Sequence, residues 1–163
     1  PDASVDGVIS MFTSFGYFSS DRENARVLHE VQRMLKPGAP FVMDYFNIDA
    51  TLKTLVAKSE RRAGKALLLE RRRYDKKSRR LIKTVRAVEG EKSEMLRESV
   101  RAYTARELEA LFRGAGLKVE GKFGDLTGVK FDAGKSPRLV LVARKRQADW
   151  KTARAAHGRK QDR

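Results

Sequence analysis

The stretch L-K-P-G-A-P-F-V-M-D-Y-F-N, residues 35–47, predicts a helix end, a tight turn and a buried strand in immediate succession. Pro37 cannot continue a helix, and Gly38 can adopt the positive φ that a turn after a helix requires. Residues 41–43 form a short apolar run, typical of a strand covered on both faces. The run ends at Asp44, and open α/β sheets bind ligands past the carboxyl ends of their strands. The alternative is an ordinary polar loop after a buried strand.

A second buried strand is predicted upstream, at residues 5–11, followed by an aromatic loop at residues 12–18. A helix over about residues 21–35 then leads into the turn, and its apolar residues recur at helical spacing. Ser20 and Glu23 have the spacing of a capping box at its start. The order of strand, helix and strand predicts two adjacent, parallel strands in one sheet.

The pattern changes after this second strand. A helix is predicted from Asn47 to about Ala63 and ends at Gly64. Alternating residues and turn sequences then predict three antiparallel strands, at residues 66–74, 80–89 and 94–103.

The remaining segments return to longer apolar patterns. Thr104 and Glu107 form a second capping box, and Gly116 is suited to end the helix that follows. Residues 117–123 are predicted to be a strand, residues 124–137 a long loop, and residues 138–145 a strongly apolar final strand.

Taken in order, these segments resemble the second half of a class I S-adenosylmethionine (SAM)-dependent methyltransferase. V-D-G-V-I-S at residues 5–10 is similar to the F-D-x-V-x-S of that family's fourth strand, and residues 35–44 to its L-K-P-G-G-x-F-x-x-D turn. Y-T-A-R-E-L-E-A-L-F-R-G-A-G-L at residues 103–117 and S-P-R-L-V-L-V-A-R-K at residues 136–145 resemble its closing part. The combination points to the fold and the cofactor class, and not to a substrate.

The resemblance implies an α/β fold: the C-terminal half of a Rossmann-like, seven-stranded methyltransferase sheet with a three-stranded antiparallel β insertion. Residues 1–145 would be a partial methyltransferase domain, with the insertion at about residues 66–103. The last strand would lie antiparallel between its two predecessors. The insertion would cap the substrate pocket or, alternatively, only cover hydrophobic surface.

The resemblance also implies a site at the ends of the first two strands. Residues expected near the cofactor are Ser10, Met11 and Phe12. Residues expected to face the substrate are Phe15, Phe18, Asp44, Tyr45 and Asn47. Tyr17 is the expected catalytic residue, because its ring can face the sulfonium and its hydroxyl can align the methyl acceptor. The alternative for the aromatic side chains is core packing.

The sequence differs from the family in the motifs that the family carries in its N-terminal half. The family's glycine-rich loop after its first strand, and the acid that holds the ribose, have no counterpart here. We therefore expect the chain to be a fragment that binds SAM poorly in isolation. Its first strand would be an unpaired edge, on which the missing N-terminal half or an oligomer partner could pair.

The charge composition indicates which kinds of partner the chain could bind. The 163 residues carry 36 Lys and Arg against 21 Asp and Glu, a net charge of +15 that attracts polyanions. The alternative is a solvated basic surface with a basic tail at residues 146–163, which is predicted to be disordered. Nucleic acid binding is expected to be non-specific and sensitive to salt.

The composition also limits the possible metal sites, membrane contacts and cellular location. The chain has no cysteine and no apolar run of membrane-spanning length, and we expect no membrane partner and a cytoplasmic location. Its two histidines are isolated, so no metal site is predicted.

Three functions stay open. The leading one is a SAM-dependent methyltransferase acting on a small-molecule acceptor. The second is an RNA methyltransferase or a nucleic-acid-binding module, although residues 11–14 are M-F-T-S where base-modifying relatives usually carry an Asn/Asp-Pro-Pro-aromatic motif. The third is a catalytically silent, methyltransferase-like partner subunit.

Overall fold

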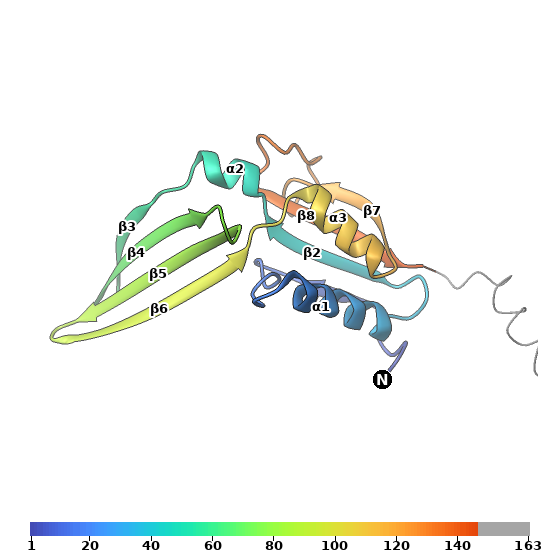
Figure 1. Ribbon diagram of the computed structural model, residues 1–163, viewed down its shortest axis with the longest axis horizontal. Coiled ribbons are helices and arrows are strands. Elements are labelled where there is room, and N and C mark those ends of the chain that lie inside the picture. Colours follow the sequence, from blue (N-terminus) through green and yellow to red (C-terminus); the bar gives the residue numbers. More distant parts are fainter. Residues whose placement is uncertain (147–163) are drawn as a thin grey trace, which may run out of the picture.

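The computed structural model describes residues 1–146, so the predicted disordered tail lies outside the described residues after Arg146. These residues form two four-stranded sheets that lie side by side, one in a body with two helices and one projecting from it (Figure 1). We call them the body sheet and the projecting sheet.

The body sheet has the strand order β1-β2-β8-β7. Its strands are β1 (Val8–Ser10), β2 (Pro40–Phe46), β7 (Leu117–Phe123) and β8 (Arg138–Lys145). The predicted parallel pairing of the first two strands is confirmed, because Ile9 lies opposite Val42 in a parallel register. The final strand, β8, lies between β2 and β7 and runs antiparallel to both, as expected. The described residues supply four strands to this sheet, and the predicted count of seven is not confirmed.

Two amphipathic helices cover the same face of the body sheet, α1 (Asp21–Met34) and α3 (Ala105–Gly114) (Figure 1). Both predicted capping boxes are present: the Ser20 hydroxyl accepts from the Glu23 N–H, and the Thr104 hydroxyl accepts from the Glu107 N–H. In each case the glutamate also accepts from the N–H of the capping residue, which satisfies a second free donor.

The core lies between these helices and the sheet. Phe112 of α3 stacks on Phe41 of β2 with ring centroids 5.3 Å apart. Residues that share this core and are almost fully buried are Leu28, Leu35, Met43, Tyr45, Leu108, Leu117, Leu139 and Leu141. Alternate residues of β2 and β8 therefore face the helices. The opposite face has no helix from the described residues, and Ile9 is 73% exposed.

The projecting sheet corrects two predictions. The helix expected over residues 47–63 is only α2 (Ile48–Lys53), and it is followed by a strand, β3 (Lys58–Ala63). The predicted three-stranded insertion is therefore a four-stranded sheet with the order β3-β4-β5-β6. The other strands are β4 (Ala66–Asp75), β5 (Arg80–Glu89) and β6 (Lys92–Arg101).

The reason for the error is the composition of β3. Its sequence K-S-E-R-R-A has no apolar alternation, because β3 is an exposed edge strand that is held by pairing with β4. Leu52, at the end of α2, and Val56, before β3, are 41% and 58% exposed.

Candidate functional site

The carboxyl ends of β1 and β2 meet at one edge of the body sheet because the two strands are parallel. The aromatic loop, residues 12–18, leaves β1 at this edge, and Asp44, Tyr45 and Asn47 lie at the end of β2. This is the position at which open α/β sheets bind ligands.

The first residues of the aromatic loop have an unusual backbone. Phe12 and Thr13 have φ values of 55° and 60°, a left-handed conformation that costs about 1–2 kcal/mol for a residue with a side chain. Two hydrogen bonds hold it: the Phe12 N–H donates to Asp44 Oδ2 at 2.9 Å, and the Thr13 N–H donates to the Asp44 carbonyl at 3.1 Å. The result is that the Phe12 ring points outward, with 81% of its surface exposed.

Asp44 has a buried carboxylate, with 1% of its surface exposed. It accepts two hydrogen bonds from the Arg138 guanidinium, at 2.7 Å from Nε and 2.6 Å from Nη2. Arg138 also donates to the Thr13 hydroxyl at 3.3 Å. This pair therefore ties β8 to β2 and holds the start of the aromatic loop. The sequence predicted no role for Arg138, because no local pattern links it to Asp44.

Tyr45 and Asn47, both expected to face the substrate, make their contacts within the chain. Tyr45 is fully buried, and its hydroxyl donates to the Arg101 carbonyl; burial raises its pKa. Asn47 caps α2 by accepting from the Asp49 N–H, and its amide donates to the carbonyls of Ala133 and Ser136 at 2.8 Å each. The burial of the Tyr45 ring leaves it no surface for a ligand.

The aromatic loop lines a hollow of about 240 Å³, to which Val27 and Val31 of α1 also contribute. Tyr17 and Phe18 are 48% and 53% exposed, whereas Phe15 is 4% exposed and packs against Tyr103 and Tyr45. The Ser10 hydroxyl, which also lines the hollow, lies 3.0 Å from the Ser14 hydroxyl. Met11 is partly buried at the start of the loop. The hollow therefore joins aromatic rings with two hydroxyl groups.

Tyr17, which is 48% exposed, keeps a hydroxyl that can form hydrogen bonds. Partial burial, and then the negative charge of Glu98, raise the pKa of Tyr17. A tyrosine hydroxyl is protonated at neutral pH in any case, so that of Tyr17 can donate and accept hydrogen bonds.

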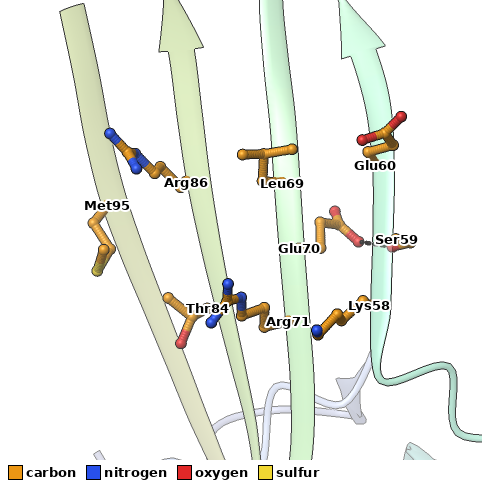
Figure 2. A pocket seen from close by; sticks show the side chains of 9 residues that line it. All are labelled: Lys58, Ser59, Glu60, Leu69, Glu70, Arg71, Thr84, Arg86 and Met95. Atoms are coloured by element: carbon orange, nitrogen blue, oxygen red, sulfur yellow. Dashed lines mark hydrogen bonds between the residues drawn. The ribbon is translucent and has the colours of Figure 1, made fainter.

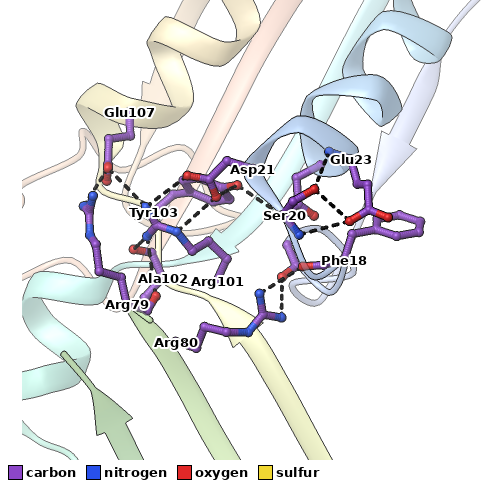
Figure 3. A network of polar contacts seen from close by, with 12 residues as sticks. Phe18, Ser20, Asp21, Glu23, Arg79, Arg80, Arg101, Ala102, Tyr103 and Glu107 are labelled. Atoms are coloured by element: carbon purple, nitrogen blue, oxygen red, sulfur yellow. Dashed lines mark hydrogen bonds and ion pairs between the residues drawn. The ribbon is translucent and has the colours of Figure 1, made fainter. Parts of the chain in front are cut away.

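The projecting sheet holds the aromatic loop from the other side. Arg80 of β5 donates to the carbonyls of Phe18, Tyr17 and Gly16, at 2.9, 3.1 and 3.3 Å (Figure 3 shows the contact with Phe18). Gly16 itself has φ 96°, and a Cβ there would lie 3.1 Å from the Tyr45 hydroxyl. The loop is thus closely packed on its inner side and exposes its rings on the outer side.

A second arginine joins the two sheets. Arg101, 6% exposed, donates to Asp21 Oδ1 at 3.1 Å, and Tyr103 donates to the same oxygen at 2.7 Å (Figure 3). Glu107 lies 3.6 Å from Arg101 and 2.6 Å from Arg79. Asp21 and Glu107 lie in the first turns of α1 and α3, so this network fixes the base of the projecting sheet to both helices. No sequence pattern distinguishes Arg80 or Arg101 from the many other basic residues, so their roles could not be predicted.

Two absences hold for residues 1–146. No group of three or more His, Cys, Asp or Glu side chains could hold a metal ion. No helix there is long and apolar enough to cross a membrane.

No protein-family model matches the sequence, and a search of curated proteins gives no significant match. Solved structures do match. The CcbJ methyltransferase from Streptomyces caelestis is 21% identical, with a TM-score of 0.74, over 89% of this chain and 61% of its own. A SAM-dependent methyltransferase from Clostridium acetobutylicum is 14% identical, with a TM-score of 0.75, over 89% of this chain and 59% of its own.

A sugar N-methyltransferase from Streptoalloteichus is 19% identical, with a TM-score of 0.63, over 88% of this chain and 57% of its own. The chain has the fold of the carboxyl-terminal part of a class I SAM-dependent methyltransferase. It spans about three fifths of the length of these matched structures. The predicted resemblance is therefore confirmed at the level of the fold.

Proposed function

We propose that this chain is part of a SAM-dependent methyltransferase that transfers a methyl group to a small-molecule acceptor. The observation that carries the proposal is the aromatic loop at the carboxyl edge of β1. Its backbone is held in a costly left-handed conformation by Asp44, and three of its rings are exposed at the edge where this class of sheet binds ligands.

The residues present fit one side of SAM. Ser10, Met11 and Phe12 would hold the cofactor's methionine part, and the exposed rings suit a positively charged sulfonium. SAM supplies, when bound, a methyl group on a sulfonium sulfur. The other side of the cofactor would need a glycine-rich loop and an acid that this sequence does not contain.

The protein's task in such a transfer is positioning. Asp44 and Arg138 would act as positioning residues, since they fix the Phe12 backbone. Arg80 would fix the far end of the loop through three carbonyl groups. Tyr17, with a protonated hydroxyl, would align the acceptor, and Phe18 would flank it. Phe15, Tyr45 and Asn47 would support the site from within the fold.

Binding of SAM by the full-length protein, measured by isothermal titration calorimetry, tests the cofactor. Phe12→Ala should weaken SAM binding by about ten-fold, because it removes an exposed ring from the cofactor edge. Leu96→Ala is the matched control: Leu96 is 64% exposed on β6, and its loss should leave SAM affinity unchanged. If the full-length protein does not bind SAM, the proposal is wrong and a catalytically silent partner subunit is favoured.

Tyr17→Phe tests the catalytic role. The change removes only a hydroxyl, so melting should be nearly unchanged, while kcat in the full-length protein should fall by about ten-fold if one transition-state hydrogen bond is lost. Equal turnover of variant and wild type would reduce Tyr17 to a packing role. The 163-residue chain alone is expected to show no activity in this assay.

A further inference from the structure

The two faces of the projecting sheet differ in how their charges are paired. On one face Glu70, 5% exposed, accepts from Arg72 and lies 3.5 Å from Arg61 Nε and 3.7 Å from Lys83 Nζ. Three cations therefore surround one carboxylate there. The opposite face carries further lysine and arginine side chains, and no carboxylate of residues 1–146 lies within 4.0 Å of the nitrogens of Lys58, Arg71, Arg86 or Arg97. We call this second face the basic face.

The strand register gathers these cations around one threonine. Lys58 of β3 lies opposite Arg71 of β4, and Arg71 lies opposite Thr84 of β5. Thr84 in turn lies opposite Arg97 of β6, and Arg86 is two residues along β5 on the same face. Directly opposed residues are about 5 Å apart and diagonal ones about 7–8 Å, within reach of arginine side chains. Thr84 therefore lies between Arg71 and Arg97, with Arg86 on the same face.

The basic face is hollowed at this point. A cavity of about 680 Å³ is lined by Lys58, Arg71, Thr84 and Arg86, whose side chains rise from the same side of the sheet (Figure 2). Leu69 and Met95 add apolar surface, and Glu60 adds one carboxylate on β3. Ser59 and Glu70, whose side chains belong to the other face by register, complete the lining. A second hollow of about 380 Å³ shares Lys58, Arg71 and Thr84.

We propose that the basic face binds the phosphate groups of a small molecule, in a site separate from the aromatic loop. Guanidinium groups bind phosphate oxygens through paired N–H donors, and a threonine hydroxyl can add a further donor. Leu69 and Met95 can contact the part of the ligand that carries no charge. The proposal does not depend on methyl transfer, since it rests on the pairing and spacing of these side chains.

A single-stranded nucleic acid is the less suitable ligand. Proteins that bind it combine cations with aromatic platforms on which bases stack. The projecting sheet has one aromatic residue, Tyr74. Tyr74 and Leu81, which lies opposite it on β5, both pack against the body core. The basic face therefore offers cations and aliphatic side chains without a stacking surface.

Titration of the chain with inorganic pyrophosphate at low ionic strength, followed by calorimetry, tests the site. We expect one bound pyrophosphate per chain, with an affinity that falls as salt is added. The double variant Arg71→Gln, Arg86→Gln should weaken binding by at least about ten-fold. Arg61→Gln is the matched control, because Arg61 lies on the neighbouring edge strand but faces Glu70, and it should leave the affinity unchanged.

Thr84→Val keeps the shape of the side chain and removes one hydroxyl, so it tests the site without removing charge. It should weaken pyrophosphate binding by about two- to ten-fold while the melting temperature stays near that of wild type. Absence of pyrophosphate binding, or equal weakening by Arg61→Gln, would overturn the proposal. Binding of a single-stranded oligonucleotide that pyrophosphate does not displace would overturn it in favour of a nucleic acid.

Discussion

The body sheet buries one face under two helices, whereas the two edge strands of the projecting sheet, β3 and β6, are largely exposed. Phe41, Met43 and Tyr45 of β2 are each 1% exposed or less, while Met95 and Leu96 of β6 are 70% and 64% exposed. The body is therefore stabilised mainly by apolar burial, and the projecting sheet by its strand pairing and by the charges on its surface. The comparison indicates that the body carries the stability of the fold and the projecting sheet is free to carry binding groups.

The core of the body should be far more sensitive to truncation than the projecting sheet. Phe112→Ala removes a buried ring stacked on Phe41 and should lower the free energy of unfolding by about 3–5 kcal/mol. Leu96→Ala should change it by less than about 0.5 kcal/mol. Urea unfolding of both variants measures the difference. Similar losses for the two would mean that the projecting sheet buries its apolar residues in solution.

The cost of removing an ion pair should also differ between the two regions. Arg138→Met leaves the buried Asp44 carboxylate without its guanidinium partner and should cost about 2–3 kcal/mol of unfolding free energy. Arg73→Met breaks a 4.0 Å pair with Asp75 on the exposed projecting sheet and should cost less than about 0.5 kcal/mol. Thermal and urea unfolding give both values. A cost for Arg138→Met as small as that for Arg73→Met would argue that water replaces Arg138 at Asp44.

The junction of the two regions should show an intermediate effect. Thr104 follows the end of β6 and caps α3, and Thr104→Ala should cost about 1 kcal/mol by removing the acceptor for the Glu107 N–H. Thr104→Ser keeps a hydroxyl and serves as the control, with most of the stability retained. Unchanged urea unfolding of the alanine variant would contradict the role of the capping box.

The pH dependence of this cap is the smallest expected effect. Burial acts to raise the pKa of Glu107, but the Thr104 N–H and hydroxyl and the Arg79 guanidinium outweigh it and lower that pKa below 4.5. The unfolded chain then binds the proton more tightly. The stability from this pairing is complete above about pH 4.5 and is lost as the pH falls through the folded pKa.

The unfolding free energy of wild type and Glu107→Gln, measured from pH 7 to pH 3, shows this effect as a difference that shrinks on acidification. A difference that stays constant over that range would show that the Glu107 charge does not contribute.

The sequence predicted the elements whose signals are local. Both capping boxes were predicted from four-residue spacings, and β2 (Pro40–Phe46) from the apolar run at residues 41–43. The strand β3 was missed because its charged sequence is stabilised by pairing with β4, which no local pattern records. The aromatic loop was located correctly, but the burial of Phe15 and the exposure of Phe12 could not be inferred from their order along the chain.

By itself, the sequence determined which segments are helices and strands in the body, because capping, turn formation and apolar periodicity depend on residues a few positions apart. Only the tertiary structure decided what the polar side chains do. Asp44 meets Arg138 from 94 residues away, and Tyr45 meets the Arg101 carbonyl from 56. The cations of the basic face meet through the register of four strands. Such contacts depend on how the whole chain packs, since a charge or a hydroxyl is satisfied by whichever partner the fold brings within reach.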